Sequence, residues 1–493
     1  MTPWPFDTVL IANRGEIALR ILRSVKAQGL RAVVVHHALD RLSPAVAQAD
    51  QAIELRGSSP VAAYLDGDAI LDAALASRAG AIHPGYGFLS ENAAFARKVQ
   101  AAGIRFIGPT PEAINLMGDK VRARAFVAQA GFPVAPSAIE DDDPSSFSER
   151  ALQVGFPLLI KPAAGGGGKG MRIVRQSEQL AGEIERARSE AQRYFGDARL
   201  YVERYIENPR HIEVQVLGDD TGQVVHLFER ECSVQRGFQK IVEESPSPAL
   251  DAATRDRICS VAAGIARRAG YRNAGTVEFI FGQGEFYFLE MNTRLQVEHP
   301  VTEQITGIDL VREQLRIAAG EPLGYTQDDV RVSGHAIEYR IYAEDPARGY
   351  TPTTGPVLSL RAPGGEGIRV DLGIVQGQDI SAAFDPMLAK LIVSGRDRQQ
   401  ALERADAALA QFVLLGCRTN IDFLRRLSRH PVFVAGDIHT GFLDAHPEVA
   451  ADVSPSPATL RRLLGAAALQ TRPLRDAAEA IPALHAAIGG WRN

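Results

Sequence analysis

Two acidic residues, Glu278 and Glu290, lie in apolar, aromatic segments at residues 276–281 and 286–292. A short turn with two glycines joins the segments, so the pattern predicts a β-hairpin that places the carboxylates opposite each other or one diagonal step apart. Asn292 shares the face of Glu290 because side chains alternate along a strand. Neighbouring carboxylates repel each other and are costly to desolvate, and a divalent cation removes both problems. Carboxylate and carboxamide oxygens favour Mg²⁺ or Mn²⁺; the alternative is an edge hairpin with two solvated glutamates.

Lysine is rare in this chain, and most of its lysines fall in segments with other signs of function. Of the 54 basic residues, seven are lysine. A lysine provides a compact point charge, which an arginine does not. Four lysines lie in candidate motifs, namely Lys120, Lys161, Lys169 and Lys240. Chance scatter is the alternative to a functional role.

A glycine-rich loop is predicted between two short strands at residues 156–161 and 172–174. It contains Gly165, Gly166, Gly167 and Gly168, followed by Lys169 and Gly170. Consecutive glycines do not suit the interior of a strand or helix, but their N–H groups can close over phosphates. The run is not a P-loop, because glycine rather than Ser or Thr follows Lys169. We interpret it as a mobile phosphate-binding loop, with a flexible linker as the alternative.

Composition limits the class of protein. A chain of 493 residues should form about three domains, and 45% hydrophobic with 23% charged residues is typical of a globular protein. The net charge of -5 argues against a nucleic-acid partner. The three cysteines have no metal-type spacing and fit a reducing cytoplasm. The N-terminus lacks a signal-peptide pattern, and no segment is apolar enough to cross a membrane.

The predicted elements that carry these residues change character along the chain. Strands and helices alternate up to about residue 118, which indicates a doubly wound α/β domain. From residue 334 strands dominate, at 334–343, 357–361, 368–371 and 387–393, before a helix at 398–412. Glu338 and Arg340 share one face of the first of these strands. Such an arginine either pairs with a carboxylate, most simply Glu338, or binds an anion.

The motifs, taken in order, resemble the biotin carboxylase component of biotin-dependent carboxylases, an ATP-grasp family. The resemblance extends from residue 11 to about residue 444. It rests on Ile11-Ala-Asn-Arg-Gly-Glu-Ile-Ala18, His83-Pro-Gly-Tyr-Gly-Phe-Leu-Ser-Glu-Asn92, Met117-Gly-Asp-Lys120, Lys161-Pro-Ala-Ala-Gly-Gly-Gly-Gly168, Glu207-Asn-Pro-Arg-His211, Glu290-Met-Asn-Thr-Arg-Leu-Gln-Val-Glu-His-Pro300 and the segment 335–346.

The resemblance implies a mixed α/β and α+β architecture in four parts. Residues 1–118 would form the N-terminal doubly wound α/β domain, and residues 119–333 an ATP-grasp domain with a mobile lid at about 135–204. Residues 334–444 would form a C-terminal, mostly antiparallel β domain with helices. Residues 445–493 would be a linker and tail.

The resemblance also implies a role for each candidate residue. ATP would be bound by Lys120, Lys161, Gly165, Gly166, Gly167, Gly168, Glu203, Ile206, His211 and Gln235, and the metal ions, two Mg²⁺ or Mn²⁺, by Glu278, Glu290 and Asn292. Bicarbonate would be bound by Lys240, Arg294, Gln296, Val297 and Glu298, with Glu298 as the general base. Arg340 would stabilise the biotin enolate oxygen, and Tyr86 is a further candidate for contact with biotin.

The chain departs from the family pattern at two places. The family usually reads Gln-Arg-Arg-His-Gln-Lys where this chain has Gln235-Arg-Gly237-Phe238-Gln-Lys240, so two polar groups near the nucleotide are replaced and Phe238 is left to stack. In the first helix, Ala27 replaces an acidic residue of the family's dimer contact, while Arg20 and Arg23 remain. A homodimer of the family type therefore has less support from the sequence.

The expected partners follow from what the chain lacks. It has no Ala-Met-Lys-Met or similar biotinyl-lysine site, so the carrier would be another polypeptide or a removed segment, and a separate carboxyltransferase would choose the acceptor. We expect neither a nucleic-acid nor a membrane partner. The predicted function is cytoplasmic, ATP-dependent carboxylation of biotin for an acyl-CoA carboxylase. Alternatives are an ATP-grasp ligase with an amine acceptor, a urea carboxylase component, and an inactive ATP-binding module.

Overall fold

The computed structural model describes residues 4–140, 143, 146–162, 170–451 and 456–479. The chain divides into two compact units, Met1–Val449 and Ala450–Asn493. Within the described part of the second unit a single helix is seen, α17 (Pro457–Glu479), in the stretch expected to be a linker and tail. No helix in the described ranges has the length and apolar content needed to cross a membrane.

The first unit begins with a parallel sheet of five strands in the order β3-β2-β1-β4-β5. Neighbouring residues of one strand face opposite cores: Val9 and Ile11 contribute to one cluster and Leu10 to the other. Burial on both faces is expected for a parallel sheet covered by helices. The elements are β1 (Thr8–Ile11), α1 (Gly15–Ala27), β2 (Arg31–His36), α2 (Pro44–Gln48), β3 (Gln51–Glu54), α3 (Pro60–Leu65), α4 (Gly67–Ser77), β4 (Ala81–His83), α5 (Ala93–Ala101), β5 (Arg105–Phe106) and α6 (Pro111–Met117).

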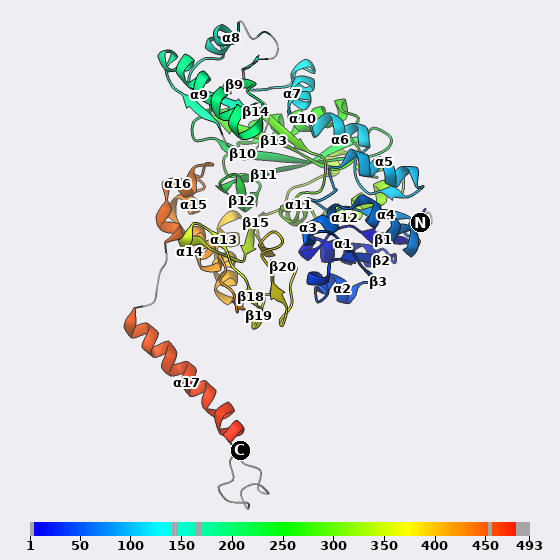
Figure 1. Cartoon of the computed structure of the whole chain (residues 1–493), viewed down its shortest axis with the longest axis vertical. Helices are drawn as coiled ribbons and strands as arrows, with labels where there is room; N and C mark the ends of the chain where they lie inside the picture. Colours follow the sequence, from blue (N-terminus) through cyan, green and yellow to red (C-terminus); the bar gives the residue numbers. More distant parts are fainter. Residues whose placement is uncertain (1–3, 141–142, 144–145, 163–169, 452–455, 480–493) are drawn as a thin grey trace, which may run out of the picture. The chain divides into compact units, whose positions relative to one another are not determined.

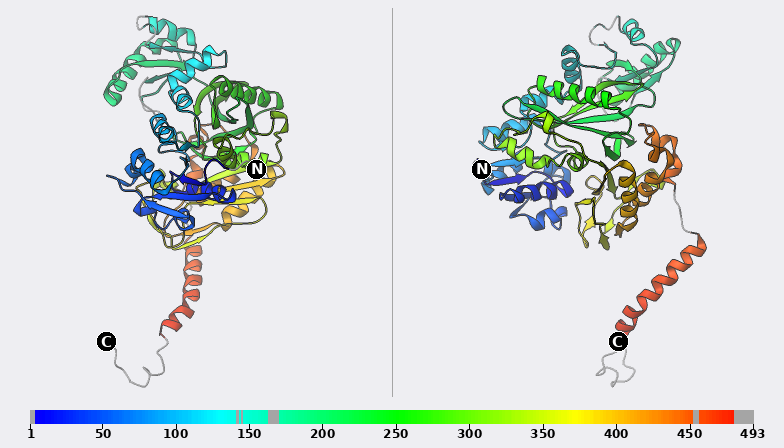
Figure 2. Two further views of the ribbon diagram at one scale, coloured as in Figure 1. Left: turned by 90° about the vertical axis from the view of Figure 1, so that its right-hand side faces the viewer. Right: turned by 180° about the vertical axis from the view of Figure 1, so that it is seen from behind.

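The lid predicted at about 135–204 corresponds to a small layer with its own sheet and core at one end of the first unit (Figures 1 and 2). Its four antiparallel strands have the order β6-β9-β7-β8, and helices α8 and α9 share one hydrophobic core with them. The elements are β6 (Ser137–Ile139), α8 (Phe147–Val154), β7 (Leu158–Pro162), β8 (Arg172–Val174), α9 (Ser177–Phe195) and β9 (Leu200–Arg204).

An antiparallel sheet of eight strands forms the centre of the first unit, in the order β14-β13-β10-β11-β12-β15-β22-β20. The strands are β10 (Arg210–Gly218), β11 (Val224–Arg236), β12 (Gln239–Ser245), β13 (Asn273–Gly282), β14 (Glu285–Asn292), β15 (His335–Tyr342), β20 (Ile368–Leu372) and β22 (Met387–Gly395). Because β12 pairs with β15, this sheet continues across the boundary predicted at residue 333. The division into domains therefore stays a prediction.

The remaining elements of the first unit surround this sheet. The helices are α7 (Lys120–Gln129), α10 (Ala252–Arg268), α11 (His299–Thr306), α12 (Leu310–Ala318), α13 (Arg398–Gln411), α14 (Ile421–Arg429), α15 (Pro431–Ala435) and α16 (Phe442–Ala445). The short strand pairs are β16 (Glu344–Asp345) with β17 (Thr351–Pro352), β18 (Gly355–Pro356) with β21 (Asp379–Ile380), and β19 (Ser359–Arg361) with β23 (Val413–Leu415). The strand expected at 357–361 is thus shorter in the structure.

Candidate active site

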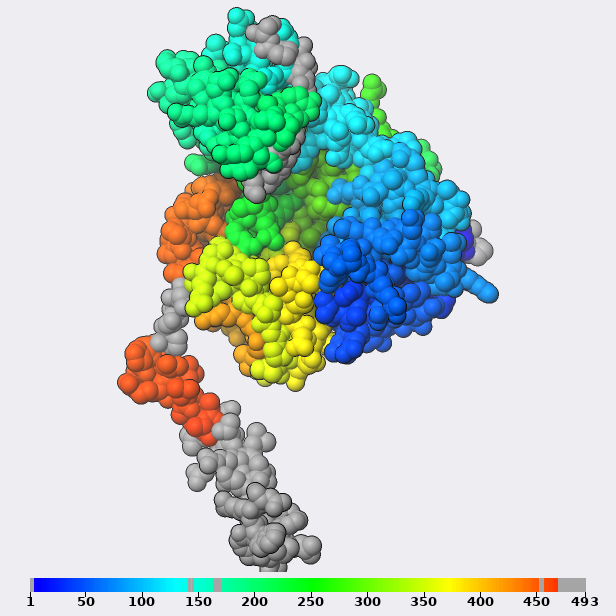
Figure 3. Space-filling model, in the orientation of Figure 1, coloured from blue at the N-terminus to red at the C-terminus, as the bar shows by residue number. Residues whose placement is uncertain are grey.

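One cavity contains all the candidate site residues that the structure describes. It lies between the lid and the central sheet, has a volume of about 1470 Å³, and opens as a hollow in the surface (Figure 3). The candidate residues that line it are Tyr86, Lys120, Lys161, Glu203, Ile206, His211, Gln235, Lys240, Glu278, Glu290, Asn292, Arg294, Gln296, Val297, Glu298 and Arg340. Gly165, Gly166, Gly167 and Gly168 lie outside the described residues.

Three carboxylates form a row across three adjacent strands at the centre of the cavity. Glu278 on β13 pairs in register with Glu290 on β14 and with Glu213 on β10. The predicted hairpin and its pairing of Glu278 with Glu290 are therefore confirmed. Glu213 was missed by the sequence reasoning, although it lies on an apolar strand where an acidic residue is unusual. Such a row of like charges requires cations close by.

Lysines supply part of this positive charge. Lys240 Nζ lies 2.5 Å from Glu213 Oε2, 2.8 Å from Glu278 Oε1 and 2.7 Å from Glu298 Oε1. Lys120, at the start of α7, places its Nζ 2.7 Å from Glu290 Oε2. Although burial lowers the pKa of Lys240, the three carboxylates raise it well above its ordinary value, so this lysine is charged at neutral pH.

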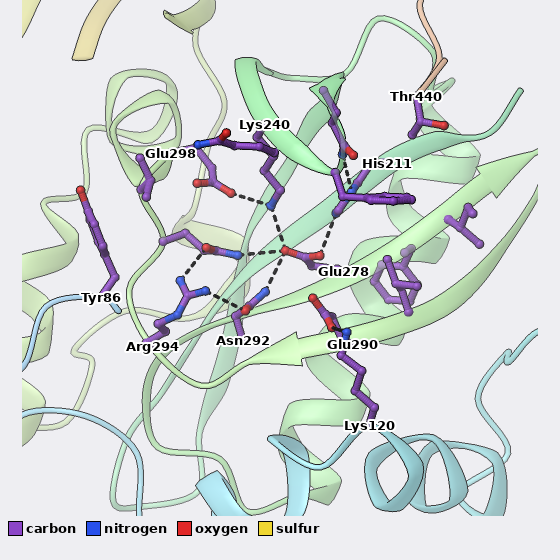
Figure 4. Close-up of a pocket in the computed structure, with 18 of the residues that line it drawn as sticks. Tyr86, Lys120, His211, Lys240, Glu278, Glu290, Asn292, Arg294, Glu298 and Thr440 are labelled. Atoms are coloured by element: carbon purple, nitrogen blue, oxygen red, sulfur yellow. Dashed lines mark hydrogen bonds and ion pairs between the residues drawn. The ribbon is translucent and has the colours of Figure 1, made fainter. Parts of the chain in front are cut away.

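Glu278 accepts contacts from several sides (Figure 4). The amides of Asn292 and Gln296 donate to its Oε1 at 2.8 and 3.0 Å, and His211 Nε2 lies 2.9 Å from its Oε2. Burial raises the pKa of Glu278, but Lys240 and His211 outweigh that effect and hold the pKa well below its ordinary value. The carboxylate is therefore ionised and orients the polar groups around it.

Glu298 is buried between two cations. Lys240 binds its Oε1, and Arg340 Nη2 lies 2.9 Å from its Oε2. Burial raises the pKa of Glu298, yet Lys240 and Arg340 lower it well below its ordinary value. The carboxylate is thus in the proton-accepting form at neutral pH, with both of its oxygens oriented by positive groups.

Of the two alternatives left open for Arg340, a carboxylate partner or an anion, the structure shows carboxylate partners, but Glu338 is not one of them. Arg340 Nε instead donates to Glu243 Oε1 at 2.6 Å, and neither carboxylate oxygen of Glu338 has a hydrogen-bond partner among the described residues. Glu338 lies directly opposite Glu243 across β12 and β15, and burial raises the pKa of Glu338 well above its ordinary value. A neutral Glu338 leaves Arg340 to the ionised Glu298 and to Glu243, whose pKa is raised by burial to about 7 although Arg340 opposes this shift.

Arg294 lies beside this centre and is held by several acceptors. Its Nη1 donates to Gln296 Oε1 at 2.7 Å and its Nη2 to Asn292 Oδ1 at 2.9 Å. Its Nε donates to Glu91 Oε2 at 2.9 Å. A bidentate contact with an anion therefore requires Arg294 to exchange at least one of these partners. The adjoining backbone is fixed as well, because Lys390 Nζ donates to the carbonyl oxygen of Val297 at 2.7 Å.

Tyr86 reaches the cavity from the loop after β4. Its hydroxyl donates to Glu16 Oε1, and Lys390 Nζ lies 3.3 Å from Glu16 Oε2. Burial raises the pKa of Glu16 to about 7, although Lys390 opposes this shift. Glu16 and Lys390 were not recognised as part of the site. The signal for Lys390 was its identity as one of the few lysines, placed on a strand that is otherwise apolar.

The lid side of the cavity carries the candidate nucleotide residues. Lys161, at the end of β7, forms an ion pair with Glu203 on β9. Across the cavity, His211 Nδ1 and Gln235 Nε2 lie 2.8 Å apart. Phe238 lies in the turn between β11 and β12, lines the cavity, and is 65% exposed.

Three family profiles cover most of the chain. "Biotin carboxylase, N-terminal domain" matches residues 5–114, "Carbamoyl-phosphate synthase L chain, ATP binding domain" residues 119–326, and "Biotin carboxylase C-terminal domain" residues 338–445. The biotin carboxylase of Halalkalibacterium halodurans is 49% identical over 447 residues, which cover 90% of this chain and 98% of that protein. The chain belongs to the biotin carboxylase family.

Two further relatives show the range of this family. The mitochondrial methylcrotonoyl-CoA carboxylase subunit alpha of Mus musculus is 46% identical over 92% of this chain, which spans 63% of that protein. A crystal structure of the biotin carboxylase domain dimer of Hydrogenobacter thermophilus 2-oxoglutarate carboxylase, in complex with MgADP, ADP and bicarbonate, superposes with a TM-score of 0.84. That protein is 44% identical, with coverage of 91% of this chain and 99% of that one.

The donor set fits the divalent cation expected in a biotin carboxylase. Glu278 and Glu290 are in register on one hairpin, and Asn292 lies beside them on β14. Their contacts with Lys120 and Lys240 show that this row already attracts positive charge. Hard oxygen donors of this kind suit Mg²⁺ or Mn²⁺ rather than a softer metal.

Proposed function

We propose that this cavity carboxylates biotin with bicarbonate and ATP. The observation that carries the proposal is Glu298, which is ionised and buried between Lys240 and Arg340, in the cavity that also holds Arg294 and the acidic hairpin. One site thus combines a base, anion donors and a row of metal-type ligands. Carboxylation of biotin by way of carboxyphosphate requires all three.

In the first step a bicarbonate oxygen attacks the γ-phosphorus of ATP, and ADP leaves. Glu298 accepts the bicarbonate proton as that bond forms. Lys240, Arg294, Gln296 and the Val297 backbone hold bicarbonate in place and offset its charge. The ionised state of Glu298 supports this role, because a protonated carboxyl group could not accept the proton.

Nucleotide and metal would bind in the same cavity. Lys120 and Lys161 would contact the ATP phosphates, and Glu203, Ile206, His211 and Gln235 would surround the adenosine. Glu278, Glu290 and Asn292 would hold Mg²⁺ or Mn²⁺, which supplies charge neutralisation to the phosphates. Binding of the phosphates would release Lys120 and Lys161 from their carboxylate partners, because those lysines form ion pairs with Glu290 and Glu203.

The second step transfers carbon dioxide to biotin. Carboxyphosphate splits into carbon dioxide and phosphate, and the phosphate removes the proton from the ureido nitrogen of biotin. That nitrogen then forms the new bond to carbon dioxide. Negative charge develops on the ureido oxygen, and Arg340 is the cation placed to stabilise it. Tyr86 lines the same cavity and would contact biotin.

Biotin would reach the site on another polypeptide or another part of a longer chain, and a carboxyltransferase would choose the final acceptor. The relatives differ in that acceptor, since one is named for methylcrotonoyl-CoA and the other for 2-oxoglutarate. An acyl-CoA is our proposal for this chain. The dimer of the related Hydrogenobacter thermophilus domain supports a homodimer as the working assembly.

The deciding experiment measures ADP release by the purified chain with bicarbonate, with and without free biotin. We expect turnover to require Mg²⁺ or Mn²⁺ and to rise when biotin is added. Omission of bicarbonate is the control, because carboxyphosphate cannot form without it. A rate of ADP release that is unchanged by biotin but rises with an added amine would contradict the proposal and favour a ligase with an amine acceptor.

A further inference from the structure

A second group of metal-type side chains lies outside the cavity, within the first unit. His430 joins α14 to α15, His446 follows α16, and Glu448 lies in the 3₁₀ turn Pro447–Ala450. One ligand atom from each side chain lies within 4.8 Å of the others. None of these residues has a part in the reaction proposed above.

Two separations within this group match those of ligands around one ion. His430 Nε2 lies 3.4 Å and His446 Nδ1 3.2 Å from the same oxygen, Glu448 Oε1. Four ligands at the usual zinc distances of about 2.0–2.2 Å form a tetrahedron with edges of about 3.3–3.6 Å. Both measured separations are close to that edge.

An ion pair without metal explains this geometry less well. Hydrogen bonds between a protonated histidine and a carboxylate are usually about 2.7–2.9 Å long, whereas both contacts here are longer and converge on one oxygen. The two imidazole rings are also close, with centroids 4.4 Å apart. Phe442 is buried against both rings, at 5.4 Å and 5.1 Å, and restrains their positions.

We propose that His430, His446 and Glu448 bind one divalent transition-metal ion, of which Zn²⁺ fits best. Two imidazole nitrogens and one carboxylate oxygen are zinc ligands and are too soft a set for Mg²⁺. Glu448 is largely exposed, so a water molecule from solvent can fill the fourth position. The ion is distinct from the magnesium or manganese of the cavity.

The ion would fasten a segment that borders the nucleotide cavity. Between the ligands His430 and His446, the Thr440 N–H donates to the Pro209 carbonyl and Arg210 Nη2 donates to the Gly436 carbonyl, both at 2.9 Å. Thr440 also lines the cavity. A metal ion bound by both ends of segment 430–448 would therefore restrain this segment, including the part of it that lines the cavity. We call this part, around Thr440, the rim.

The test is titration of the metal-free, full chain with Zn²⁺ by calorimetry, together with the absorption spectrum of its Co²⁺ form. We expect one site with a tetrahedral cobalt spectrum, and affinity at least roughly tenfold weaker in His446→Ala and Glu448→Gln. Glu448→Gln removes the charge of the side chain with almost no change in its volume. This variant should therefore fold as the wild type does, and weaker binding would reflect the loss of a ligand. His439→Ala is the matched control, because His439 lies in the same segment but outside the cluster, and it should bind as the wild type does.

Two further measurements distinguish the proposed zinc site from the metal site in the cavity and test its effect on segment 430–448. His211→Ala removes a ligand from the cluster of His211, Glu213 and Glu278 in the cavity, and it should leave the proposed site intact. Hydrogen exchange of residues 436–441 should slow with Zn²⁺ in the wild type but not in His446→Ala. Equal Zn²⁺ affinity in the wild type, His446→Ala and Glu448→Gln would overturn the site, and unchanged exchange despite binding would overturn its effect on the rim.

Discussion

At the scale of single residues, Glu298 and Glu290 have different charged partners, and this supports the different roles that we propose for them. Glu298 contacts Lys240 and Arg340, whereas Glu290 contacts Lys120. The two glutamates therefore act on different partners, and their amide variants should fail in different ways.

We expect Glu298→Gln to lose about 10²-fold or more of biotin-dependent turnover, the usual scale for a positioned base. It should still bind ATP, because the change leaves the phosphate and metal contacts in place. Steady-state kinetics and ATP calorimetry measure the two effects. Glu290→Gln is the comparison variant, and it should raise the Mg²⁺ concentration needed for turnover. Near-normal turnover in Glu298→Gln would exclude its role as the base.

Glu16 gives the stability of the fold a pH dependence. Burial raises its pKa from 4.5 to about 7, so the folded state binds this proton more tightly than the unfolded state. The resulting contribution to the free energy of unfolding is complete below pH 4.5 and is lost as the pH rises through about 7.

In Glu16→Gln this part of the pH dependence should disappear. Urea unfolding of wild type and variant at a series of pH values across that window measures the difference. We expect the free energy of unfolding to fall less steeply with rising pH in the variant. Parallel pH profiles would show that Glu16 keeps an ordinary pKa in the folded protein.

At the scale of elements, the turn between β11 and β12 carries Phe238 into the cavity that we propose for the nucleotide. Gly237 and Phe238 both have positive φ, 51° and 69°, as a two-residue hairpin turn requires. An aromatic residue is unfavourable in this conformation. Because Phe238 is nevertheless present and exposed in the cavity, we expect its ring to contact the nucleotide.

The variant Phe238→Asn distinguishes the effect of the turn conformation on stability from the effect of the aromatic ring on nucleotide binding. Asparagine tolerates positive φ better than phenylalanine, so the melting temperature should be unchanged or slightly higher. Loss of the ring should raise the KM for ATP several-fold with little change in kcat. Thermal melts and ATP-dependence kinetics test both effects. An unchanged KM for ATP would show that Phe238 does not touch the nucleotide.

At the scale of the whole first unit, the lid is a separate layer that closes one side of the cavity. Its core consists of residues from its own sheet and from α8 and α9, so it can move without breaking the central sheet. Lys161 and Glu203 on the lid and Glu278 and Glu290 on the central sheet line one cavity. Closure would exclude water from carboxyphosphate, which hydrolyses readily.

We expect ATP to slow hydrogen exchange across the lid, most strongly next to the glycine-rich loop and around Lys161. Lys161→Ala should reduce this protection, because it removes a phosphate contact from the lid. Exchange in the five-stranded sheet serves as the internal control and should not change. Equal lid exchange with and without ATP would contradict closure by the nucleotide.

The sequence by itself determined the local features of this protein. The alternation of strands and helices predicted the parallel N-terminal sheet, and turn glycines with alternating side chains predicted the hairpin that pairs Glu278 with Glu290. These features depend on neighbours in the chain, whose spacing fixes which face each side chain occupies. The motifs that resemble biotin carboxylases added the candidate residues, and those described line one cavity.

The tertiary structure alone decided which charges meet. The order of strands in the central sheet places Glu213 beside Glu278 and β12 beside β15, so Lys240 contacts three carboxylates and Arg340 selects Glu243 over Glu338. Strand order between distant segments is set by the packing of whole layers, which local spacing does not encode. Burial then decided the protonation of Glu16 and Glu338, because the cost of desolvating a carboxylate depends on everything packed around it.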